Sequence, residues 1–94
     1  MAVLIAGEAP GMTVEQYDQV NEVLGISSAA DVEGLICHTA GVTEGGGLYA
    51  SDVWESNEAC ERFINDRLIP EFEQLGIVGR TQPTVVQVHN HMHE

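Results

Sequence analysis

Short apolar stretches and amphipathic stripes alternate in the first part of the chain. Residues 2–6 form an uninterrupted apolar run closed by Gly7, which is typical of a buried strand. Thr13 and Gln16 then have the spacing of a capping box, and apolar residues recur at helical intervals as far as Gly25. Because glycine readily adopts the left-handed conformation that ends a helix, the pattern predicts a strand followed by one amphipathic helix.

The second part of the chain predicts a hairpin, a helix and a last strand. Residues 35–42 and 48–55 carry β-forming side chains, and the glycine-dense segment 43–47 between them must turn the chain. Ser56 can cap a helix at its N-terminus. Residues 84–91 are again rich in strand formers.

The predicted order of elements is β-α-β-β-α-β, the split arrangement of an α+β ferredoxin-like domain with a four-stranded antiparallel sheet. We expect one such domain over residues 1–94. Pro70 should kink the second helix or begin a further turn. Two helices cover only one face of the sheet, which leaves an apolar face open. A second copy is the most economical cover, so the order of elements predicts a homodimer with its two sheets face to face.

The charge balance excludes several classes of partner. Fifteen acidic residues face three arginines and no lysine, which gives a formal net charge of −12. Nucleic acids and anionic membrane surfaces are bound through lysine and arginine, so we expect neither as a partner. No apolar run approaches the ~20 residues that span a bilayer, and the N-terminus lacks the basic flank of a secretory signal. These features predict a cytoplasmic protein with a solvated acidic exterior.

The two cysteines predict buried thiols. Cys37 falls in a predicted strand and Cys60 in a predicted helix, and their spacing fits neither a close pair nor a metal motif. Small apolar packing is the ordinary role of such cysteines in the cytosol.

Residues 52–63, with the sequence DVWESNEACERF, resemble the antibiotic-biosynthesis-monooxygenase-like families of the dimeric α+β barrel superfamily. In those families a strand ending in an acid-Val-Trp pattern runs into a Ser- or Asp-capped helix, and residues 88–90 look similar too. The resemblance implies a dimeric barrel. Its members include oxygenases, cyclases and haem degraders, so the fold alone does not fix the reaction. The strand asparagine and helix histidine that haem degraders use have no counterpart here, so we expect no haem degradation.

The predicted hairpin brings candidate chemistry together. A regular turn across residues 43–47 sets His38 across from Asp52 on one face of the sheet. The same register sets Ile36 across from Trp54. Asp52 would orient the imidazole and favour its protonated form, which suits acid–base catalysis. Trp54 would wall a cavity and could stack a planar ligand. The structural alternative is a half-buried histidine satisfied by Asp52 beside a tryptophan of the core, and a one-residue slip would split the group.

Other aromatic and histidine side chains are weaker candidates. Tyr17 and Tyr49 could contact a ligand, or could simply pack with their hydroxyls at a rim. His89, His91 and His93 alternate along the last predicted strand and could ligate a transition metal, but chain ends fray. We therefore expect His89 as a ligand contact, and no metal and no cofactor.

The sequence as a whole predicts a small dimeric protein with a cleft for a hydrophobic, aromatic or polyketide-like small molecule. For an enzyme, the resemblance implies a cofactor-independent monooxygenase or cyclase. His38 would be its base, Asp52 the orienting group and Trp54 the stacking wall. The alternative is a non-catalytic module that binds a small ligand or another protein. The residues alone leave both readings open.

Overall fold

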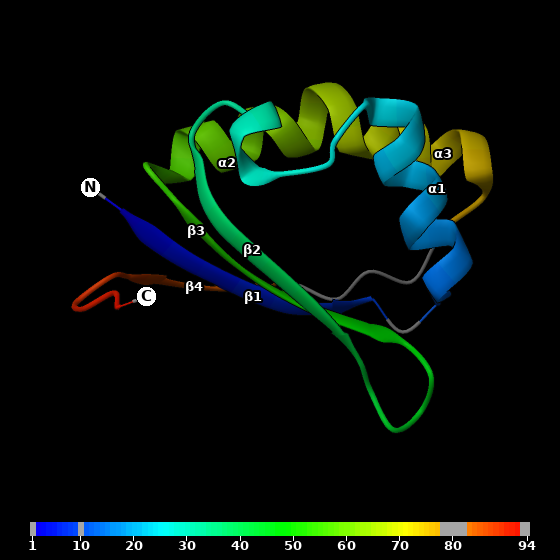
Figure 1. The fold of residues 1–94 in the computed structure, drawn as a ribbon, viewed down its shortest axis with the longest axis horizontal. Coiled ribbons are helices and arrows are strands. Elements are labelled where there is room, and N and C mark those ends of the chain that lie inside the picture. The colour runs from blue at the N-terminus through cyan, green and yellow to red at the C-terminus, as the bar shows by residue number, and fades with distance from the viewer. Residues whose placement is uncertain (1, 10, 78–82, 93–94) are drawn as a thin grey trace.

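The computed structural model describes residues 2–9, 11–77 and 83–92, in which helices lie over one face of a sheet (Figure 1). The strands are β1 (Val3–Ala9), β2 (Leu35–Val42), β3 (Leu48–Trp54) and β4 (Thr84–Gln87). The helical segments are α1 (Val14–Leu24), the 3₁₀ turn η1 (Ala29–Asp31), α2 (Asn57–Phe63), the π-helical turn η2 (Ile64–Leu68) and α3 (Ile69–Leu75). The predicted α+β order is confirmed, and η1 is an addition to it.

The sheet has the strand order β2-β3-β1-β4 with antiparallel neighbours, as predicted. Ile5 on β1 lies opposite Asp52 and Val85 on the face that the helices cover. Leu4 lies opposite Val53 and Val86 on the other face, because side chains alternate along a strand. The register therefore gives the sheet one face that packs against the helices and one face that points away from them.

Strand β1 is longer than the sequence predicts, because Gly7 lies inside it instead of closing it. A Cβ atom at Gly7 would stand 3.3 Å from Pro83. Glycine inside a strand often marks such a close approach of another segment. The last strand is shorter than predicted, since β4 ends at Gln87 and His89 lies beyond it in a bend.

The β2–β3 hairpin has the predicted register over most of its length. His38 lies opposite Asp52, as expected, but an irregularity between Leu35 and Cys37 then shifts the pairing. Leu35, and not Ile36, therefore lies opposite Trp54, so this part of the prediction is wrong. A bulge places two residues opposite one and re-aims the side chains beyond it.

Helix α1 begins and ends at the predicted residues. The Gln16 amide donates to the Thr13 hydroxyl at 3.1 Å, and the Thr13 amide donates to the Gln16 side chain at 3.0 Å. Gly25 adopts the left-handed conformation, with φ of 72°. These caps satisfy backbone groups that a helix end otherwise leaves without partners.

The second predicted helix is a continuous helical segment with a wide turn in it. Ser56 accepts a hydrogen bond from the Ala59 amide at 3.1 Å, as expected of an N-cap. After α2 the π-helical turn η2 leads into α3, and Pro70 lies in the first turn of α3. Proline lacks an amide hydrogen and its ring clashes with the preceding turn, so the wide turn accommodates it. Arg67 of η2 donates to the Leu24 carbonyl at 2.7 Å and so ties this segment to the end of α1.

Helix α2 packs tightly against the chain just before the start of β2. Gly34 has φ of +85°, and a Cβ atom there would stand 2.6 Å from the Cβ atom of Ala59. Trp54 is 2 % exposed and shares a core cluster with Ala59 and Cys60. The face of the sheet away from the helices, in contrast, leaves Leu4, Tyr49 and Val86 more than one-third exposed. We call this side the open face.

Candidate functional site

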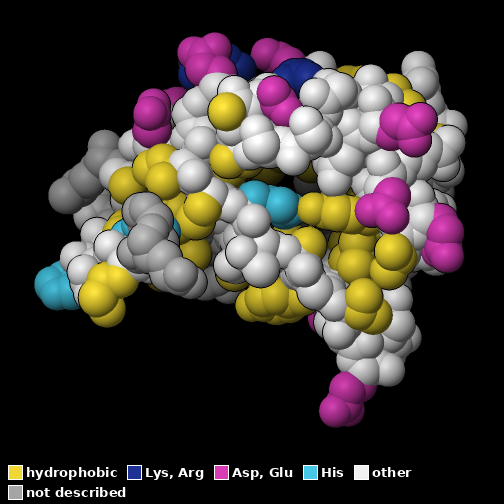
Figure 2. Space-filling view, viewed as in Figure 1, with side chains coloured by type: hydrophobic (Ala, Val, Ile, Leu, Met, Phe, Trp, Pro, Cys, Tyr) yellow, Lys and Arg dark blue, Asp and Glu magenta, His cyan; other side chains and the backbone are white. Residues whose placement is uncertain are grey.

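A cavity of about 220 Å³ lies between the helices and the sheet. Figure 2 shows the molecule hollowed there, with apolar side chains and a histidine at the edge of the hollow. Most of the lining is apolar and includes Ile5, Met12, Val20, Leu35, Leu48, Trp54, Phe63, Leu68 and Phe72. Tyr17, His38 and Asp52 also line it, and they contact one another. An apolar cavity with a few convergent polar groups is the usual form of a small-molecule site.

His38 and Asp52 are hydrogen-bonded in this cavity, between Nδ1 of the imidazole and Oδ1 of the carboxylate, and the contact becomes an ion pair when the imidazole is protonated. The other carboxylate oxygen accepts a hydrogen bond from Trp54 Nε1 at 3.3 Å. An ionised carboxylate only accepts hydrogen bonds, so the Nδ1 proton of His38 must be the donor. Asp52 thereby fixes the orientation and the tautomer of the imidazole.

Tyr17 completes the group from α1. Its hydroxyl oxygen lies 2.5 Å from Nε2 of His38. Tyr17, which the sequence predicts as a ligand contact, is thus the hydrogen-bond partner of His38, the candidate base. Local residue spacing does not predict this pairing, because it depends on the angle at which α1 packs over the sheet.

The pKa of His38 is raised above its ordinary value. The hydrogen bond to Asp52 is the largest cause, and its charge adds to the effect, whereas burial of the imidazole opposes it. The His38 side chain keeps 32 % of its surface exposed, so the opposing penalty is that of a half-buried group. The direction agrees with the expectation drawn from the sequence.

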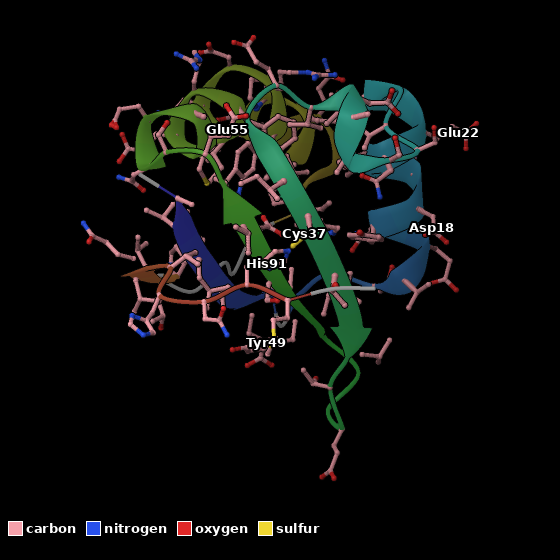
Figure 3. All side chains as sticks on the ribbon, turned by 60° about the vertical axis from the view of Figure 1, so that its left-hand side comes forward. Asp18, Glu22, Cys37, Tyr49, Glu55 and His91 are labelled. Carbon is pink, nitrogen blue, oxygen red and sulfur yellow. The ribbon has the colours of Figure 1, made fainter. Side chains whose placement is uncertain are left out.

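Two predicted ligand contacts lie away from the cavity. Tyr49 is on the open face, and Figure 3 shows it on the side of the sheet away from the helices. His89 is exposed beyond the end of β4. Neither of them lines the cavity. Tyr49 fails to reach it because adjacent residues of a strand point to opposite faces, and Leu48 takes the inner position.

The described residues contain no group of three or more His, Cys, Asp or Glu side chains that could hold a metal ion. His93, the third of the alternating histidines, lies outside them. Both cysteines are free thiols. Burial, with smaller contributions from nearby carboxylates, raises the pKa of the Cys60 thiol to about 11, so it is protonated and a poor nucleophile at neutral pH.

The charges around the cavity favour a neutral ligand. No lysine or arginine appears among its lining residues, all of which fall within the described part of the chain, and the Asp52 carboxylate is acidic. The negative charge of the whole protein adds to this preference for a neutral ligand, and Figure 3 shows Asp18 and Glu22 of α1 directed outward.

Within the described residues, none of the helices is long and apolar enough to span a bilayer.

Comparison with known proteins shows similarity in structure but not in sequence. No protein-family model matches the chain, and no curated protein matches it either. Among solved structures, Rv0793 from Mycobacterium tuberculosis is similar with a TM-score of 0.69 and 13 % identity, covering 97 % of this chain and 98 % of that one. SnoaB from Streptomyces nogalater, a cofactor-independent oxygenase solved as a mutant, has a TM-score of 0.63 and 14 % identity, with 99 % and 97 % covered.

A third structure is that of a candidate antibiotic biosynthesis monooxygenase from Chloroflexus aurantiacus. It has a TM-score of 0.64 and 13 % identity, and 98 % of each chain is covered. The TM-scores establish the fold, whereas sequence identities this low leave the reaction open. The resemblance drawn from residues 52–63 is thus confirmed at the level of structure. The chain has the α+β fold of the antibiotic biosynthesis monooxygenases.

Proposed function

We propose that this protein binds a small neutral phenol in its cavity and that the His38–Asp52 pair takes up the phenolic proton, so that the ring reacts with dioxygen without a cofactor. The observation that carries the proposal is the oriented imidazole that lines a largely apolar cavity. A carboxylate that holds the imidazole and stabilises its protonated form is a recurrent arrangement for general bases. The similarity of fold to SnoaB, a cofactor-independent oxygenase, is a further support.

The volume and charge of the cavity define the substrate class. An engineered apolar cavity of roughly 150 Å³ binds benzene in another protein. The 220 Å³ here therefore suits a molecule of about one or two rings. A carboxylate or phosphate group on the ligand would lose its hydration without gaining a lysine or arginine partner, which is costly. Phe63 offers aromatic surface to such a ring, and the buried Trp54 packs against Phe63.

The reaction balances with dioxygen as the co-reactant. Loss of the phenolic proton to the base makes the ring electron-rich enough to give electrons to dioxygen. One oxygen atom then becomes bonded to the ring. The hydrogen of that ring carbon and the phenolic hydrogen leave with the other oxygen atom as water, so the product is a quinone.

The test uses 1-naphthol in air-saturated buffer. We expect naphthoquinone formation with consumption of one equivalent of dioxygen, and incorporation of one labelled atom from ¹⁸O₂. His38→Gln should lower the rate by about 10²–10⁴-fold, the usual contribution of a general base. The anionic analogue 1-hydroxy-2-naphthoic acid should not bind. Binding of 1-naphthol without quinone formation would contradict the enzymatic proposal and favour a ligand-binding module.

The open face suggests how two copies of the chain associate. Leu4 on β1 and Val86 on β4 expose apolar surface directly opposite each other, and Tyr49 on β3 exposes more of it further along the same face. We infer that a second copy of the chain covers this face. The sheet of each protomer would then be buried on both sides, and each cavity would stay on the outer, helix-covered side.

A further inference from the structure

Tyr17 blocks direct access to the basic nitrogen of His38. The ring planes of the two residues are only 12° apart and their centroids are 6.0 Å apart. With the phenol oxygen 2.5 Å from Nε2, the rings meet edge to edge rather than face to face. The lone pair of a neutral imidazole nitrogen lies in the ring plane. The Tyr17 oxygen therefore occupies the position from which a proton would reach Nε2.

The partner of Nδ1 makes this blockage chemically significant. Because Nδ1–H of His38 donates a hydrogen bond to Asp52, the basic nitrogen of neutral His38 is Nε2, and its partner is the Tyr17 hydroxyl. Tyr17 lines the cavity, and its oxygen has acceptor capacity left for a ligand hydroxyl after it donates a hydrogen bond to Nε2. His38 can then act on the ligand through Tyr17.

We propose that Tyr17 is the residue that contacts the substrate hydroxyl and relays its proton to His38, given the proposed function of the cavity as a phenol site. The substrate O–H bond breaks and a new O–H bond forms on Tyr17. The original Tyr17 O–H bond breaks at the same time and an N–H bond forms at Nε2 of His38. The products are a phenolate, a neutral tyrosine and an imidazolium held by Asp52. The restored Tyr17 hydroxyl donates a hydrogen bond to the phenolate and stabilises it.

The experiment measures ionisation of a bound dye, 3-nitrophenol, whose phenolate absorbs at a longer wavelength than the neutral form. It is done at a pH between the folded-state pKa of His38 and the solution pKa of the dye, so that the imidazole can accept a proton and free dye is mainly neutral. The variant is Tyr17→Phe, which removes only the hydroxyl. The matched control is Tyr49→Phe, which makes the same change on the open face, away from the cavity.

For wild-type protein and Tyr49→Phe we expect the bound dye to be largely phenolate. For Tyr17→Phe we expect the phenolate fraction of the bound dye to fall at least about fivefold, and the dissociation constant to rise by up to about tenfold because ionisation on binding contributes to the affinity. A Tyr17→Phe protein that binds the dye and keeps the phenolate fraction would show that His38 acts directly, and would overturn the relay while leaving the proposed function intact. Failure of the wild-type protein to bind the dye would contradict the proposed function itself.

A second measurement does not depend on the folding of Tyr17→Phe. The chain has two tyrosines, so Tyr49→Phe protein produced with 3-fluorotyrosine carries one fluorine label, at Tyr17. Binding of the dye should shift the ¹⁹F resonance, because the Tyr17 hydroxyl turns from His38 to the dye oxygen. A resonance that stays unchanged while the dye binds would overturn the relay.

Discussion

His38 on β2 and Asp52 on β3 are directly opposed residues of an antiparallel pair, and their side chains hydrogen-bond on the face that the helices cover. The pairing holds the imidazole with Nδ1 toward the carboxylate and Nε2 toward α1. One cross-strand contact therefore fixes the orientation, the tautomer and the proton affinity of the candidate base.

Loss of the Asp52 charge should lower the pKa of His38. In Asp52→Asn the hydrogen bond and the charge that raise this pKa are removed or weakened, while the burial that opposes them remains. NMR titration of the His38 ring measures the change. Asp31→Asn is the matched control, because Asp31 is fully exposed in the η1 turn and accepts from the Ser27 and Ser28 amides. An unchanged His38 titration in Asp52→Asn would contradict the pairing.

The raised pKa of His38 makes the stability of the protein depend on pH. Because the His38 pKa is raised on folding, protonated His38 stabilises the folded state fully below its ordinary pKa of about 6.5. The stabilisation is lost as the pH rises through the folded-state pKa. The difference in free energy of unfolding between the wild-type protein and Asp52→Asn should therefore shrink as the pH rises from about 6 to 9. Urea unfolding at several pH values tests this, and a difference that grows over the same range would contradict it.

Gly34→Ala should destabilise the fold more than Gly25→Ala. Both glycines have positive φ, so both substitutions carry the backbone strain of about 1–2 kcal/mol. Only at Gly34 does the new Cβ atom meet a neighbour, Ala59, at 2.6 Å, whereas nothing lies within 4 Å at Gly25. Overpacking should add about 1–3 kcal/mol at Gly34. Urea unfolding measures both variants, and equal losses would show that the strand–helix contact is looser than described.

The open face should be a dimer interface. Sedimentation of the wild-type protein at micromolar concentration should give about twice 10.2 kDa. Val86→Asp places a charge on the open face and should give a folded monomer. Val23→Asp adds the same charge at an exposed position on α1 and should leave the dimer intact. A wild-type protein that sediments as a folded monomer would remove the basis for the paired sheets.

Local sequence patterns predicted the elements well, because caps and turns are short-range chemistry. Thr13, Gly25 and Ser56 mark helix ends in both the sequence and the structure. The approach of Tyr17 to His38 was not predictable, since it depends on how α1 packs over the sheet.

The partner of Trp54 was mispredicted for a local reason. The extra residue of a bulge leaves no clear signal among strand-forming residues, so the sequence predicts a regular register as far as Ile36. The predicted register is observed up to His38, which lies before the irregularity when counted from the turn. The candidate base and its orienting carboxylate were therefore predictable, and their surroundings were not.

The most direct test of the central claim follows the His38 ring by NMR while 1-naphthol is added at a pH above the folded-state pKa of His38. The account predicts that the His38 ring resonances move to the positions of the imidazolium on binding, because ionisation of the phenol adds one proton to Nε2. The same addition to Asp52→Asn should give binding with little protonation. Binding that leaves the His38 resonances unchanged, or that perturbs only residues of the open face such as Tyr49, would contradict the account.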